Sequence, residues 1–154
     1  MAFLLLRQEI RSRKQAEIAL QKQAEAVHDL YNHVPRGYHL LDADGIFIRI
    51  NETELEWLGY TRDEVLYKKT FAELETAQSA SVFQESFPKF KEQGWISAVE
   101  FELMRKDGTL LPVSLSATGI NDAEGNFVMS RSTLFDISER KRGEAERKQV
   151  QAAL

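Results

Sequence analysis

VEFELMRKDGTLLPVSLSATGINDAEGNFVM, residues 99–129, is the stretch of sequence that decides the fold class. Apolar side chains alternate with polar ones over 99–103 and again over 111–115, and a third run of the same kind starts at Phe127. A period of two predicts β-strands. Both gaps between the runs contain turn residues, KDG and NDAEG, so we expect three long antiparallel strands joined by hairpins.

The residues before this stretch add two short strands and a helical connection. Runs of β-forming residues at 38–42 and 46–50 flank the turn sequence Asp42-Ala43-Asp44-Gly45. A longer helix is predicted over 77–93, with a kink or a late start caused by Pro88. Three short helices precede it, each with a capping side chain three residues before a glutamate: Asn51 and Glu54, Thr61 and Glu64, Thr70 and Glu73. The sum is an α+β fold with a five-stranded antiparallel sheet and helices on one face.

Helices flank this central part on both sides. Residues 1–31 form an N-terminal helix that is too polar to be stable alone, so we expect a coiled-coil-like signalling segment that packs on a partner. The central domain covers 32–136, and residues 137–154 begin a C-terminal output helix. Asp136 is expected to cap this helix, with Glu139 reaching back, so domain and helix meet almost without a linker.

Composition excludes several classes of site and partner. A net charge of -4 argues against a nucleic-acid-binding domain, because phosphate contacts need a basic face. The chain has no cysteine, which rules out disulfides, thiolate metal sites and cysteinyl cofactor adducts. Only three histidines are present, so no metal site is predicted. The apolar residues 1–6 precede several arginines, which fits either the end of a transmembrane helix or the first turn of a soluble one.

Several motifs of the chain resemble the PAS (Per-Arnt-Sim) family. They are the DADG turn at 42–45 followed by IFIRIN at 46–51, then WLGYTRDEV at 57–65, FELMRKDGT at 101–109 and DISERK at 136–141. The resemblance spans about 28–142, and Ser138 stands where the family often has threonine. It is nearest to PAS modules of bacterial sensor histidine kinases. It implies strand order 2-1-5-4-3 and helices over one face that enclose a small cavity.

The resemblance also bears on cofactors, and none is predicted. Oxygen-sensing members carry a haem-ligating histidine on the long helix, where this chain has Phe83 and no histidine at all. Light-oxygen-voltage members and photoactive yellow protein use a cysteine, which is absent. Haem and a cysteinyl flavin are therefore disfavoured, and no motif supports a noncovalent flavin.

Candidate site residues lie where the implied cavity would be. His39 shares a strand face with Leu41; if that face points inward, His39 is either a hydrogen-bonded core residue or a polar contact for a ligand. Apolar walls of the cavity, or simply core, are expected at Phe83, Phe87, Phe101 and Leu115. Capping and solvent exposure explain the carboxylates on the short helices, so no catalytic residues are assigned: Glu52, Glu54, Glu56, Asp63, Glu64.

The predicted function is sensing and signal relay within a larger multidomain receptor, which we expect to be a histidine kinase. The domain is expected in the cytoplasm, with any contact to a membrane made through an upstream segment. The chain itself is non-catalytic, pairs with a second copy through its flanking helices, and passes the signal to the exit helix. Asp136, as a cap, and Arg140, as an ion-pair partner, are the candidate relay residues. Two alternatives stay open: a ligand-free dimerisation or docking module with a filled core, and a small enzyme of the ketosteroid-isomerase type with an inward acid or base.

Overall fold

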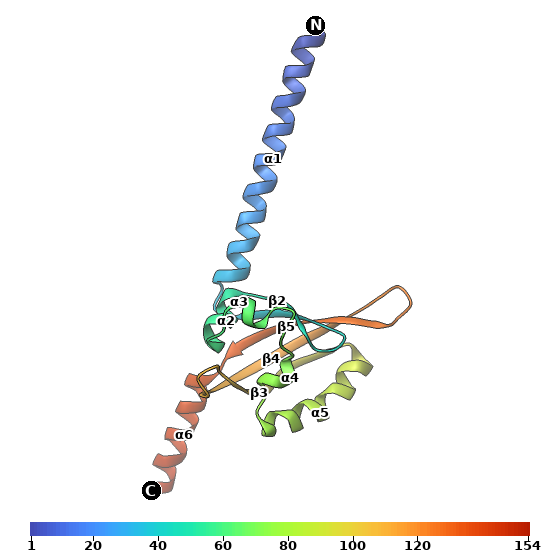
Figure 1. Cartoon of the computed structure of the whole chain (residues 1–154). Coiled ribbons are helices and arrows are strands. Elements are labelled where there is room, and N and C mark those ends of the chain that lie inside the picture. The colour runs from blue at the N-terminus through green and yellow to red at the C-terminus, as the bar shows by residue number, and fades with distance from the viewer. The chain divides into compact units, whose positions relative to one another are not determined.

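A computed structural model describes all 154 residues, Met1–Leu154. They form two compact units, Met1–Val34 and Pro35–Leu154. The first unit is helix α1 (Ala2–His33), which ends two residues later than the sequence pattern indicated. No helix of the chain has both the length and the apolar character that crossing a membrane requires. The second unit holds the remaining elements (Figure 1): β1 (Gly37–Asp42), β2 (Phe47–Ile50), α2 (Glu52–Leu58), α3 (Arg62–Val65), α4 (Phe71–Leu74), α5 (Ala77–Gln93), β3 (Trp95–Met104), β4 (Leu110–Asn121), β5 (Phe127–Asp136) and α6 (Ser138–Ala153).

The strands form one antiparallel sheet in the order β2-β1-β5-β4-β3, which confirms the expected PAS-like topology. The chain's first and last strands, β1 and β5, are neighbours at its centre, and β4 pairs with β5 over almost its whole length. β3 starts at Trp95, earlier than the predicted run. Its register with β4 shifts between Ile96 and Val99, so its first residues do not continue the alternation from which the strand was predicted. Ala98 has a φ of 53° in this bulge, which breaks the period of two that marks a strand.

The short helices begin where the capping pattern placed them. Thr61 and Thr70 form complete capping boxes with the glutamates three residues later, and Asn51 caps α2 through the amide of Glu54. α5 runs through Pro88 without a late start, and Gly94 ends it in the left-handed conformation that glycine adopts without strain. The helix starts follow from local side-chain hydrogen bonds.

The core lies between one face of the sheet and the helices α2 to α5 (Figure 1). Fully buried side chains from the helices, such as Leu58 and Val65, meet alternate residues of β3 and β4, such as Leu103 and Val113. Phe71 of α4 packs edge-on against Phe101 of β3, with ring centroids 5.9 Å apart. Burial of this apolar surface stabilises the fold by about 25 cal/mol per Å².

Candidate functional site: a cavity with a buried histidine–glutamate pair

A cavity of about 270 Å³ lies between α4, α5 and the inner face of the sheet. Its wall is largely apolar and contains a row of phenylalanines from α5, in which Phe83 and Phe87 are stacked with centroids 5.1 Å apart. The core is therefore not completely filled. The wall consists of His39, Leu41, Asp42, Ala43, Asp44, Gly45, Thr70, Phe71, Ala72, Phe83, Ser86, Phe87, Phe90, Ile96, Phe101, Leu115, Ala117, Phe127, Ser130 and Ser132.

The candidate residues from the sequence meet at this cavity. His39 and Phe101 approach it from the sheet, Phe83 and Phe87 from α5, and Leu115 from β4. His39 and Leu41 both line the cavity, so the face of β1 that they share is the inner one. Whether these residues bind a ligand stays a prediction.

Polar groups form a short strip across the two central strands. His39 of β1 lies opposite Ser132 of β5, and Leu41 lies opposite Ser130. Both serines are buried, at 3% and 7% exposure for Ser132 and Ser130. Ala117 of β4 stands beside Ser132 in the register, and its small side chain leaves room above the strip. The cavity therefore combines apolar walls with a few hydrogen-bonding groups on the sheet, as ligand pockets usually do.

His39 is paired with Glu54 of α2, and both side chains are completely buried. Its Nδ1 atom lies 2.7 Å from Glu54 Oε1 and 3.0 Å from Oε2. The other ring nitrogen, Nε2, is buried without a hydrogen-bond partner. A buried polar atom left without a partner costs about 1–3 kcal/mol, so this nitrogen is poised for a further contact.

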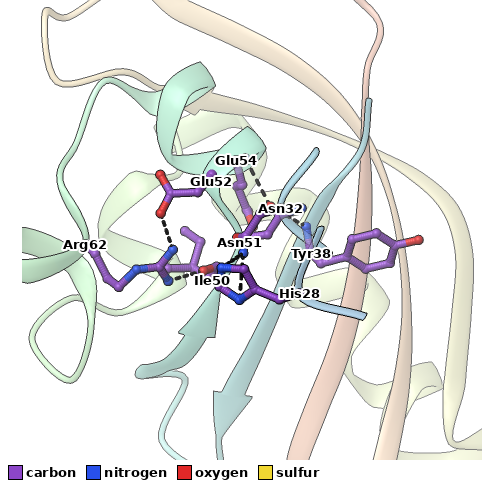
Figure 2. A network of polar contacts seen from close by, with 8 residues as sticks. All are labelled: His28, Asn32, Tyr38, Ile50, Asn51, Glu52, Glu54 and Arg62. Carbon is purple, nitrogen blue, oxygen red and sulfur yellow. Dashed lines mark hydrogen bonds and ion pairs between the residues drawn. The ribbon is translucent and has the colours of Figure 1, made fainter. Parts of the chain in front are cut away.

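The side chain of Asn51 joins the two elements that carry this pair (Figure 2, which draws Glu54 and Tyr38 but not His39). The side chain of Asn51 accepts hydrogen bonds from the amides of Tyr38 on β1 and Glu54 on α2, at 3.0 and 3.1 Å. Asn51 thus ties the strand that carries His39 to the first turn of the helix that carries Glu54. Gly37 completes the fit, because a Cβ atom at this position would lie 3.2 Å from Glu54 Cβ.

The interpretation of Glu54 as an exposed capping residue is wrong. Its side chain leaves the helix start and binds His39, while Glu52, two residues earlier, is partly exposed and forms an ion pair with Arg62 at 2.5 Å (Figure 2). The helical period could have indicated the burial of Glu54, because Glu54 and Leu58 are four residues apart and share the buried face of α2. Only His39 of the pair lines the cavity, so no carboxylate of α2 faces it as a catalytic base.

A second carboxyl is held in an apolar setting away from the cavity. Glu75 follows α4, and its Oε1 atom is buried without a partner. Burial raises the pKa of Glu75 to about 7. This group titrates near neutral pH but does not line the cavity.

The junction between β5 and α6 is tightly bonded. Asp136 accepts hydrogen bonds from the amide and hydroxyl of Ser138, at 2.9 and 2.5 Å, and buried Ile137 donates its amide to Pro112 of β4 at 3.1 Å. The predicted capping box of Asp136 and Glu139 is wrong, since Ile137 is the N-cap and no side chain caps the helix. The helix begins one residue too late for Asp136 to be its N-cap.

Ion pairs attach the first turn of α6 to the sheet. Arg140 and Lys141 lie 2.9 and 2.8 Å from the same carboxylate oxygen of Glu100 on β3. The hydrogen bond from Lys141, together with the two positive charges, holds the pKa of Glu100 below its usual range. Arg140 is therefore an ion-pair partner across the junction, while its role in signalling stays a prediction.

The chain is similar to several known proteins in sequence or in fold. The chain is 28% identical over 131 residues to a methyl sulfide methyltransferase-associated sensor of Methanosarcina acetivorans, with 84% of the chain but only 13% of that protein covered. The PAS domain of a Colwellia psychrerythraea protein superposes with a TM-score of 0.66 at 18% identity, covering 79% of this chain and 98% of that one. A PAS domain from a two-component sensor histidine kinase superposes with a TM-score of 0.61 at 14% identity, covering 75% and 97%.

The family model for the PAS domain matches residues 35–139. This range takes in the whole sheet, the cavity, the His39–Glu54 pair and the junction with α6. The motifs, the strand order and this match agree, and the chain belongs to the PAS domain family.

Proposed function

We propose that this chain is a sensory and relay module in which occupancy of the cavity changes the position of β5 and thereby of α6. The observation that carries the proposal is that a single strand does both tasks. β5 supplies Ser130 and Ser132 to the cavity wall and then passes directly into the exit helix at Ser138. A cavity of about 270 Å³ supports a ligand-binding module over a docking module with a filled core.

The bonding at the junction supports a stiff connection. Ile137 is buried and hydrogen-bonded to β4, and its carbonyl accepts the amide of Lys141 at 3.0 Å. A shift of β5 therefore reaches α6 without slack. The exposed ion pairs with Glu100 are individually weak, so they offer little resistance when a shift of β5 moves α6.

Association with a second copy is the next element of the proposal. α1 exposes apolar residues along its length, for example Leu20 at 67%, Val27 at 59% and Leu30 at 67%. A long helix with such side chains in water is stabilised by packing on a partner, and a second copy of the same helix supplies a matching surface. We infer a homodimer that forms through the flanking helices, with the signal entering through α1 and leaving through α6.

The parent protein is inferred to be a larger receptor, with a histidine kinase as the output. The matched relative is named a sensor and is far longer than this chain, and one superposed domain comes from a sensor histidine kinase. The chain itself carries out no catalysis in this proposal and binds no nucleic acid. The receptor presents this domain in the cytoplasm, and any membrane attachment lies upstream. We infer that any ligand of the cavity is a noncovalently bound small molecule other than haem, since the resemblance puts Phe83 where oxygen-sensing members have a histidine and since the chain has no cysteine for an adduct.

Replacing Asp136 by Ala in the full-length receptor tests the relay. Asp136 ties Ser138 to the strand end, so we expect its loss to uncouple input from kinase activity while the thermal midpoint of the domain changes little. Asp122→Ala is the matched control, because Asp122 makes the same kind of turn contacts in the β4–β5 hairpin, with the amides of Glu124 and Asn126. Equal signalling by wild type and Asp136→Ala receptors would contradict the proposed route.

A further inference from the structure

We propose that the cavity selects uncharged, largely apolar ring compounds that carry a hydrogen-bond acceptor, and that Nε2 of His39 donates to this acceptor. This inference rests on the proposed sensing function and names the ligand class of the same cavity. It starts from Nε2, a buried nitrogen without a partner on a side chain that lines the cavity. Because Glu54 occupies Nδ1, the edge of the ring that carries Nε2 is the one left for a ligand.

The charge balance of the buried pair favours a hydrogen on Nε2. Glu54 and His39 are both inaccessible to solvent, and a buried net charge is far more costly than a neutral or balanced pair. Two balanced states keep a hydrogen bond in which the acid or the ring donates its proton across the short contact: a carboxylate with an imidazolium, and a carboxylic acid whose proton is donated to Nδ1 of a neutral imidazole. In both states Nε2 carries a hydrogen. Nε2 is an acceptor only when the neutral ring is protonated at Nδ1. That tautomer faces either an unbalanced carboxylate or a carboxylic acid whose O–H is turned away from the ring and gives up its hydrogen bond to it, and both arrangements are costly in a buried site.

The rest of the wall sets the size and charge of the ligand. An apolar cavity of about 150 Å³ holds benzene, so a cavity of about 270 Å³ has room for a substituted benzene or a small bicyclic ring. The stacked Phe83 and Phe87 offer flat faces to such a ring. Asp42 and Asp44 also line the cavity, and their carboxylates disfavour an anionic ligand. A ketone, an ether or a ring nitrogen meets these conditions, whereas a carboxylic acid does not.

Binding of three probes to the whole chain tests the proposal. Acetophenone presents only an acceptor, indole presents only an N–H donor, and ethylbenzene has neither group but resembles acetophenone in shape. Calorimetry or ligand-observed NMR gives their dissociation constants for the wild type and for the double variant His39→Leu/Glu54→Met. This variant removes the pair together and leaves no unpaired buried charge. We expect it to bind acetophenone about tenfold more weakly and the other two probes within about threefold of the wild type.

A second measurement keeps the test independent of the variant's folding. In wild-type protein with ¹⁵N-labelled histidine, Nε2 of His39 should give the nitrogen resonance of a protonated ring nitrogen, and its proton should shift when acetophenone is added. Selective loss of indole binding, equal loss for all three probes, or an unprotonated Nε2 would overturn the inference. If the wild type binds ethylbenzene without favouring the acceptor, only the inference fails; if it binds no probe, the proposed sensing function fails with it.

Discussion

The buried pair of His39 and Glu54 gives the sharpest stability prediction. Each side chain is completely inaccessible to solvent, and Glu54 reaches His39 through both carboxylate oxygens. Removing one partner leaves the other in an apolar environment, whereas removing both leaves no polar group behind. The single variants His39→Leu and Glu54→Met and their combination therefore form a double-mutant cycle.

The structure gives a different cost for each single variant. His39→Leu leaves a buried carboxyl that must stay charged without a partner or take up a proton, which costs about 3–5 kcal/mol. Glu54→Met leaves a buried imidazole whose Nδ1 lacks a partner, which costs about 1–3 kcal/mol. Replacing both by apolar residues of similar volume should cost less than His39→Leu alone, within about 2 kcal/mol of the wild type.

Urea unfolding at neutral pH measures these differences, with Trp57 of α2 and Trp95 of β3 as fluorescent reporters. We expect equal slopes with denaturant and a free energy of coupling of about 2 kcal/mol or more between the two sites. Additive single effects, or a double variant less stable than His39→Leu, would refute the account of a mutually dependent pair.

Four further variants test other parts of the structure. Burial raises the pKa of Glu75 from 4.5 to about 7, so the folded state holds an extra proton between these values and stability falls as pH rises through them. Glu75→Gln should remove this fall. In thermal melts it should add about 1–2 kcal/mol of stability at a pH of about 8, after solvent screening, and nothing at a pH of about 4. Gly37→Ala should cost about 1–3 kcal/mol by pushing against Glu54, while Gly143→Ala, which meets nothing within 4 Å, should be neutral or stabilising. Glu100→Gln removes both ion pairs that attach α6 to the sheet. It should lower the stability of the domain by roughly 0.2–1 kcal/mol per pair and speed amide exchange in the first turn of α6. Unchanged exchange would show that these pairs do not hold the helix.

Local sequence signals accounted for most elements of the fold. Alternation and turn residues placed β4 and β5, and side-chain caps placed α2 to α4, because both depend on neighbours within a few residues. The start of β3 was missed because the bulge at Ala98 breaks the alternation. The strand order came from the resemblance alone, since the pairing of β1 with β5 joins segments about 90 residues apart and leaves no local pattern.

The candidate site was predicted in outline. Strand parity placed His39 and Leu41 on one face without deciding whether it is the inner one, and helical spacing placed Phe83 and Phe87 together. The cavity at which they meet was implied by the family resemblance. The pairing of His39 with Glu54 could not be predicted, because Glu54 also fits a capping pattern and the contact joins residues 15 positions apart in the sequence. The strip of Ser130 and Ser132 depends on the register between β1 and β5, which the alternation does not specify.

Amide hydrogen exchange with and without saturating acetophenone tests the central claim most directly. If occupancy of the cavity acts through β5, the change in protection should extend from Ser132 through Ile137 to Lys141, whose amide is bonded to the Ile137 carbonyl. A change confined to α5 and the cavity wall, with exchange at Ile137 and Lys141 the same in both samples, would contradict the claim.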